Sequence, residues 1–120
     1  MALRDFIVHE ENDNLYRKLT QPSSGGKVGD PGLVGDRPCV LLTDQDAAGC
    51  ATVKFHGSFR VRVEGQGASA AAALAINAPV YYDTGATVKI NGDATNGVRF
   101  GTLVEAVASG ATATAVVDLH

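Results

Sequence analysis

The chain has 120 residues, the length of one small domain, and a formal net charge of −3 with no cluster of lysines and arginines. That charge distribution argues against a nucleic-acid-binding surface. No apolar run approaches the roughly 20 residues that cross a bilayer, and the first residues lack the apolar core of a signal peptide. With no tryptophan and 6% aromatic residues, the core must be built from small side chains, so self-association would add burial that a single chain lacks.

The first 28 residues differ in texture from the rest of the chain. Two short apolar patches, residues 6–8 (FIV) and 15–16 (LY), lie among charged residues, and residues 21–26 (QPSSGG) have the composition of a flexible link. Because patches of this size cannot nucleate a core, we expect residues 1–28 to form an N-terminal docking arm and link. The residues expected to dock are Arg4, Asp5, Phe6, Ile7, Val8, Leu15 and Tyr16.

Two alternatives for this segment stay open at the level of sequence. A short helix over residues 12–19 has a candidate N-cap in Asn12 or Asp13, although a helix of that length is marginal in isolation. The segment is otherwise an edge strand folded back on the body. If it is an arm, removal of residues 1–20 should leave the body folded.

From residue 29 onward, short apolar runs alternate with turns that contain glycine or proline. A turn at residues 29–32 (GDPG) leads to short strands around residues 33–34 and 39–42. Residues 51–63 alternate apolar and polar side chains, with a break at residues 57–58. The charged face of the second half, which carries Arg60 and Arg62, is expected to meet solvent or another subunit.

Residues 66–77 are the segment that predicts a helix. Ser69 can cap the alanine-rich run that follows it, alanine has the highest helix propensity, and Pro79 would end the helix. Strands are then predicted at residues 80–83 and 86–90, followed by turns of the Asn-Gly type.

Residues 97–119 predict a pair of strands. Ala113, Ala115, Val117 and Leu119 alternate with more polar residues in the second strand, whereas residues 98–107 are apolar on both faces and should be central. Gly101 within that strand is typical of a bulge or a close backbone approach. The sequence as a whole predicts a mainly-β fold, a small compact barrel or sandwich with one short helix. The turns expected to be critical for this fold contain Gly29, Asp30, Pro31, Gly57, Pro79, Gly101 and Gly110.

Signals for catalysis and for cofactor binding are weak throughout the chain. Residues 25–27 (GGK) match the end of a phosphate-binding loop, but Val28 replaces the Ser or Thr that would hold magnesium. The three histidines are scattered without metal-ligand spacing, and Cys39 and Cys50 are expected to be free thiols. We therefore predict a protein that is not an enzyme, with no catalytic residue, no cofactor and no metal site.

Several segments, in their order along the chain, are similar to those of a known protein family. They are residues 29–35 (GDPGLVG), 39–43 (CVLLT), 53–59 (VKFHGSF), 78–83 (APVYYD) and 101–112 (GTLVEAVASGAT). Together they resemble the small phage capsid decoration proteins, also called capsid cement proteins, over roughly residues 29–119. The resemblance implies a β-tulip-like body over residues 29–120, similar in fold to the lambda-type head decoration protein.

The resemblance also implies a function. Members of that family bind the outer surface of an icosahedral phage head as homotrimers and stabilise the expanded, DNA-filled capsid. The expected partners are the major capsid protein and further copies of this chain, with no nucleic acid and no membrane. The expected location is the virion, after synthesis in the host bacterial cytoplasm. A monomeric SH3-like module that binds another protein is the alternative, and the mass in solution separates the two.

Overall fold

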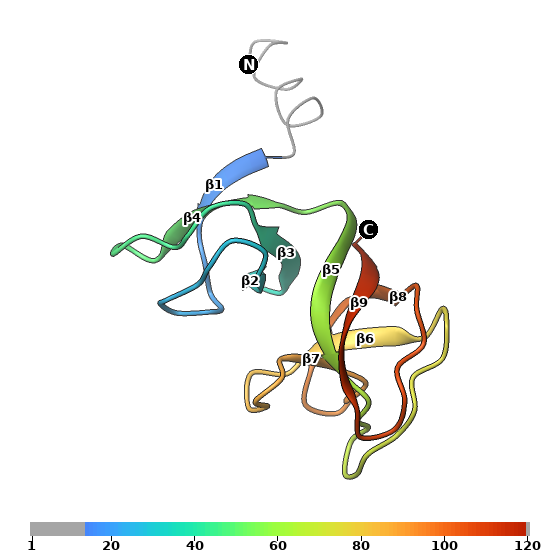
Figure 1. Cartoon of the computed structure of the whole chain (residues 1–120). Coiled ribbons are helices and arrows are strands. Elements are labelled where there is room, and N and C mark those ends of the chain that lie inside the picture. Colours follow the sequence, from blue (N-terminus) through green and yellow to red (C-terminus); the bar gives the residue numbers. More distant parts are fainter. Residues whose placement is uncertain (1–13, 120) are drawn as a thin grey trace.

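The computed structural model describes residues 14–119, and over that range the chain forms nine strands and no helix. Figure 1 shows two β units, an N-terminal sheet of four strands and a closed barrel. The strands are β1 (Asn14–Lys18), β2 (Pro31–Val34), β3 (Arg37–Leu41), β4 (Cys50–Lys54), β5 (Gly57–Glu64), β6 (Pro79–Tyr82), β7 (Ile90–Asn91), β8 (Val98–Leu103) and β9 (Thr112–Leu119). The predicted mainly-β fold with a small barrel is confirmed.

The N-terminal sheet is antiparallel, with its strands in the order β1-β4-β3-β2. Alternate residues of β4 face inward, as the sequence pattern predicts, so that Ala51 and Val53 are buried. The chain before β2 covers the outer edge of that strand, because the amide of Leu33 donates to the Gln21 carbonyl at 2.8 Å. The small core of this sheet contains Leu19, Cys39, Leu41, Ala51, Val53 and Phe55.

The barrel closes in the order β5-β7-β6-β8-β9, with β9 returning to β5. Its longest ladder joins β5 and β9 over their whole length, from Gly57↔Leu119 to Glu64↔Thr112. The alternation predicted for β9 is confirmed at Ala115, Val117 and Leu119, which are buried, while Ala113 is exposed near the strand's start. Closure is completed by the two-residue strand β7, which pairs parallel to β5 and antiparallel to β6.

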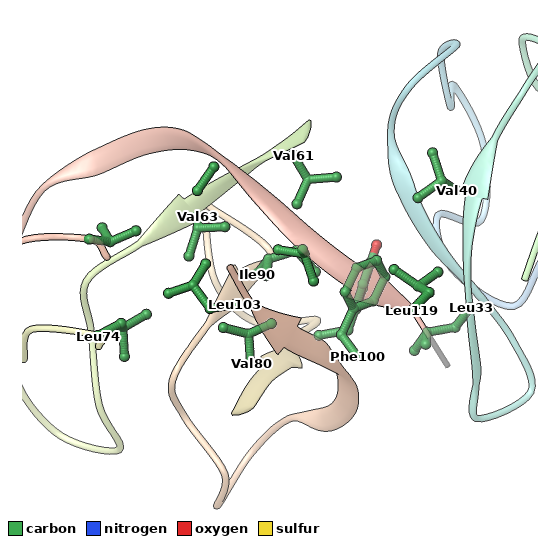
Figure 2. Packing of buried hydrophobic residues seen from close by; sticks show 14 residues of the cluster. Leu33, Val40, Val61, Val63, Leu74, Val80, Ile90, Phe100, Leu103 and Leu119 are labelled. Carbon is green, nitrogen blue, oxygen red and sulfur yellow. The ribbon is translucent and has the colours of Figure 1, made fainter. Parts of the chain in front are cut away.

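The two units share a hydrophobic core. Leu33 of β2 and Val40 of β3 belong to the cluster that fills the barrel, and Figure 2 shows them beside Phe100 and Leu119. Burial of these side chains fixes the N-terminal sheet against one end of the barrel. The domain is therefore a single packed body rather than two independent ones.

The helix predicted over residues 66–77 is wrong. The segment is an irregular connection with two isolated bridges, Gln66↔Ala71 and Leu74↔Val107. Leu74 is buried, but Ile76 is 60% exposed and the alanines between residues 70 and 75 face solvent, so Leu74 is the one side chain of residues 70–76 that packs into the core. Helices draw most of their stability from such packing, and alanine propensity does not replace it.

Two predicted strands are shorter than expected. The strand predicted at residues 86–90 contributes only Ile90 to β7, and the strand predicted at residues 98–107 ends at Leu103. Beyond that point Val104 is 39% exposed, and Val107 bridges to Leu74 instead of continuing the ladder. Leu74 and Val107 exchange backbone hydrogen bonds of 2.8 and 2.9 Å, and both residues are buried.

The predicted arm and link are wrong from Asn14 onward. β1 pairs with β4 in register from Asn14↔Lys54 to Lys18↔Cys50, and Leu19 is buried in the core of the N-terminal sheet. The alternative of an edge strand is confirmed for residues 14–18. The helix predicted over residues 12–19 is wrong over the same residues, which form β1. A domain boundary at residue 28 therefore cuts through the sheet, and removal of residues 1–20 would take away β1 together with a core leucine. The docking residues predicted at positions 4–8 lie outside the described residues.

The turn residues lie where special backbone geometry is needed. Gly29, Gly57 and Gly110 have φ values of 88°, 119° and 74°. At Gly101 a Cβ atom would lie 2.4 Å from the Asp118 carbonyl oxygen, which confirms the predicted close backbone approach. The β6–β8 register also shifts between Val80 and Tyr81 at this level of the barrel. Pro31 and Pro79 each begin a strand, and the Asp30 carboxylate accepts a hydrogen bond of 2.9 Å from the Lys27 amide.

Both cysteines are free thiols, as predicted. Cys39 is fully buried in the N-terminal sheet, and this burial raises the pKa of its thiol to about 12. Cys50 is only partly covered. The two thiols therefore differ in solvent accessibility, although the same prediction was made for both from the sequence.

Candidate functional site

β1 is the open edge of the N-terminal sheet. Among the described residues it pairs only with β4. The Thr52 carbonyl, which lies opposite Tyr16, accepts a hydrogen bond of 2.8 Å from Leu42 on the other side of β4. Since hydrogen-bonded and non-bonded pairs alternate in an antiparallel ladder, the backbone groups of Tyr16, and of Lys18 two residues on, point away from β4. The Tyr16 carbonyl accepts an exposed hydrogen bond of 3.1 Å from the Arg17 side chain, which a further strand would have to displace. With that exchange the edge can accept a further strand.

The side chain of Tyr16 is held on that edge. It is 60% exposed, and its hydroxyl donates to the Asp46 carboxylate. Asp46 also accepts hydrogen bonds from the amides of Ala48 and Cys50, at 3.0 and 2.9 Å. The hydrogen bond to Asp46 raises the pKa of Tyr16 to about 12, and the same bond holds the pKa of Asp46 below its usual value. An aromatic ring is thereby presented to solvent in a fixed position.

A cleft of about 490 Å³ lies between the N-terminal sheet and the barrel. Its volume is in the range of small-molecule sites. The side nearer the sheet is formed by Pro22 and residues 28–31, and the barrel side by residues 60–62 of β5, Tyr82 of β6, residues 87–89 and Thr114 of β9. The cleft therefore exists only because the two units are packed together.

The charges that line this cleft are mostly positive. Arg60 forms an exposed ion pair with Glu105 at 3.4 Å, and Lys89 Nζ donates to the Thr84 carbonyl at 2.8 Å. The Arg62 side chain makes no ion pair or hydrogen bond within residues 14–119. Asp30 is the acidic residue of the lining. Two cationic residues, Arg62 and Lys89, thus line the cleft with no carboxylate bound to them in this part of the chain.

Tyr82 forms the floor of the cleft. Its side chain is 2% exposed and its ring lies 6.4 Å from that of Phe100. Burial raises the pKa of the Tyr82 hydroxyl to about 12, with smaller contributions from Asp30 and Cys39. Every polar side-chain atom that is fully buried among the described residues has a hydrogen-bond partner, whereas the Tyr82 hydroxyl has none among them. The hydroxyl is therefore not fully buried and must reach solvent. Tyr82 lines the cleft, so the hydroxyl reaches solvent there.

A second, more polar opening of about 670 Å³ lies at the barrel end and includes Glu64, Asp83 and Asp93 in its lining. The Asp93 carboxylate accepts hydrogen bonds from the amides of Thr95 and Asn96 and from the Asn96 side chain, at 3.0, 3.1 and 2.9 Å. The hydrogen bonds from Asn96 hold the pKa of Asp93 below its usual value. Asp83 accepts from the Gly85 amide at 3.0 Å. These carboxylates are used to build turns.

The structure separates the predicted site residues. Leu15 and Tyr16 lie together on β1, whereas the predicted turn residues are spread over both units. Of the latter, Gly29, Asp30 and Pro31 line the cleft. Sequence reasoning missed Tyr82 and Lys89 as cleft residues, because they come from separate strands and loops. The one sequence signal was the charged face of residues 60–64, which was expected to meet solvent or another subunit.

Within residues 14–119, no three residues among His, Cys, Asp and Glu are grouped as a metal site would require. In the same range there is no helix of the length and apolarity that would cross a membrane.

Comparison of the chain with models of protein families, with curated proteins and with solved structures finds no match.

Proposed function

We propose that this protein is a structural decoration protein, which binds the outer surface of an icosahedral phage head as a homotrimer and stabilises the expanded, DNA-filled capsid. Its partners are then the major capsid protein and two further copies of itself. The observation that carries the proposal is the open edge of β1, since its outward backbone groups at Tyr16 and Lys18 offer a place for a strand of the capsid.

The position of this edge in the chain supports the proposal. The apolar residues predicted to dock, Phe6, Ile7 and Val8, precede β1 by only a few residues. The residues predicted to dock and β1 are therefore neighbouring segments of the chain. Three such segments on one trimer raise the effective concentration of each, so contacts that are weak singly hold firmly together.

An apolar surface on the barrel supports self-association. Ile76 and Val104 are exposed, and the chain segments that carry them are joined by a hydrogen bond of 2.8 Å from the Asn77 amide to the Leu103 carbonyl. Exposed alanines of residues 70–75 continue this surface. A contact between copies would bury it.

Capsid attachment tests the proposal. The full chain, mixed with expanded capsids that lack a decoration protein, should co-sediment with them and appear by cryo-electron microscopy as trimers at threefold positions. Deletion of residues 1–13, which leaves β1 and Leu19 in place, should keep the melting temperature and abolish most attachment. Phe6→Asp should reproduce the defect, because docking would desolvate the new charge. Glu10→Gln is the matched control and should attach normally.

The mass in solution tests the trimer separately. Three chains of 12.4 kDa give about 37 kDa, whereas the alternative of a monomeric adaptor gives the mass of one chain. A monomer that leaves capsids undecorated would overturn the proposal.

A further inference from the structure

We propose that the cleft between the N-terminal sheet and the barrel binds an organic carboxylate that has an apolar body. The inference is independent of capsid docking, because the cleft and the open edge of β1 are formed by different residues. The carboxylate belongs either to a free small molecule or to an acidic side chain of a protein segment, and the chemistry of recognition is the same in both.

The net positive charge of the residues that line the cleft favours an anionic ligand. Arg62 lines it without an ion-pair partner among residues 14–119, while Arg60 is engaged by Glu105 at 3.4 Å. Lys89 adds a positive charge to the lining, although its ammonium donates to the Thr84 carbonyl at 2.8 Å. A guanidinium presents paired donors that match the two oxygens of a carboxylate. The acidic lining residue, Asp30, opposes binding of a second negative charge. The balance favours a monoanion over a phosphate dianion.

A phenolic donor on a largely buried side chain lines the same space. The Tyr82 hydroxyl belongs to a side chain that is 2% exposed, and none of the hydrogen bonds of the described residues uses it. A buried polar group that lacks a protein partner is costly unless solvent or a ligand satisfies it. Since Tyr82 lines the cleft, its hydroxyl can donate to a carboxylate oxygen that Arg62 holds.

The remaining lining fits an apolar body. The lining includes Val28 and the prolines Pro22 and Pro31, and the largely buried Val61 and Val88 also border the cleft. Val28 is largely exposed, as expected of a side chain at the rim of a site that a ligand would cover. A lining that combines apolar side chains with a few polar groups is typical of a small-molecule site.

The test is an NMR titration of the full-length protein with phenylacetate, with phenylacetamide as the neutral counterpart and inorganic phosphate as the simple anion. Phenylacetate up to about 10 mM should shift amides of residues 28–31, 60–62 and 87–89, and phenylacetamide should bind at least about tenfold more weakly. A capped peptide with adjacent leucine and glutamate identifies the source: tighter binding than phenylacetate assigns a protein segment, and weaker binding assigns a free small molecule.

Three variants assign the contacts. Arg62→Glu should weaken phenylacetate binding at least about tenfold. Tyr82→Phe should weaken it about tenfold while keeping the fold, because only an unbonded hydroxyl is removed. Lys18→Glu makes a similar charge change on β1, away from the cleft, and should bind as the parent does.

Several results would overturn the proposal. One is the absence of shifts in the cleft with either phenylacetate or the peptide. Another is equal binding of phenylacetate and phosphate, which would show an adventitious ion only. A third is normal binding by both Arg62→Glu and Tyr82→Phe.

Discussion

The barrel and the N-terminal sheet differ in whether their outermost strands have a free edge. Every barrel strand is paired on both sides, so that unit has no free edge, whereas in the sheet β1 has no second partner strand among residues 14–119. Their cores differ too: the barrel cluster also takes in Leu33 and Val40 of the sheet, while the sheet's own cluster has six buried residues. From this comparison we expect the barrel to contribute most of the stability. We expect the N-terminal sheet, with the cleft beside it, to provide the surfaces that bind partners.

The largest effect is expected at the barrel seam. Gly101→Val places a Cβ about 2.4 Å from the Asp118 carbonyl oxygen and should destabilise the protein by about 4 kcal/mol, measured by urea unfolding. Gly85→Val is the control, because its nearest neighbour, Asp83 Oδ1, would lie at an ordinary 3.6 Å. If Gly101→Val melts at the temperature of the parent, the close approach is not structural.

Two leucine truncations compare the units directly. Leu103→Ala removes a fully buried side chain of the barrel and should cost about 3 kcal/mol, whereas Leu19→Ala in the smaller core should cost about 2 kcal/mol, because a site near an edge relaxes more easily. Equilibrium unfolding of both variants measures the difference. A larger loss for Leu19→Ala would reverse the assignment of stability to the barrel.

Cys39 makes the N-terminal sheet sensitive to alkali. Its thiol has a pKa of about 12 in the folded protein against 9.0 as the ordinary value, so both states hold the proton below pH 9. Above that pH only the unfolded chain ionises, and stability falls by about 1.4 kcal/mol per pH unit until the folded thiol titrates near pH 12.

The window between pH 9 and 10 isolates this effect, because Tyr82, whose pKa is also raised to about 12 by burial, ionises in the unfolded chain only near pH 10.0. Urea unfolding of Cys39→Ala over that window should show a flatter decline than the parent. Parallel declines in the two proteins would contradict the prediction.

The smallest effect is expected at the open edge. In the parent, Tyr16 should ionise at a pKa of about 12, because its hydroxyl donates to Asp46. Asp46→Asn removes the charged acceptor and should return this pKa toward 10.0, with no resolvable change in melting temperature. Ultraviolet absorbance titration of phenolate formation measures it, with Tyr16→Phe as the control that identifies the signal. An unshifted titration would mean that the ring is not held by Asp46 in solution.

Some of the fold follows from local pattern. The period-two alternation of β5 and β9 predicted most of the side chains that are buried, with Ala113 as the exception. Turns were expected at positions 29, 57 and 110, and the glycines there have positive φ. These features depend on neighbours in the chain, so the sequence alone contains the information. The absence of a cysteine motif likewise indicated two free thiols.

Other features were decided only in three dimensions. Residues 66–77 have high helix propensity. In the folded protein Leu74 instead pairs with Val107, and this tertiary contact outweighs the helix propensity of the segment. β1 looked like an arm because its apolar residues are few, yet pairing with β4 supplies the burial that the segment lacks by itself. The cleft brings Arg62, Tyr82 and Lys89 together from separate parts of the chain. Such contacts join residues far apart in sequence, and no local pattern records which strand a given segment will meet.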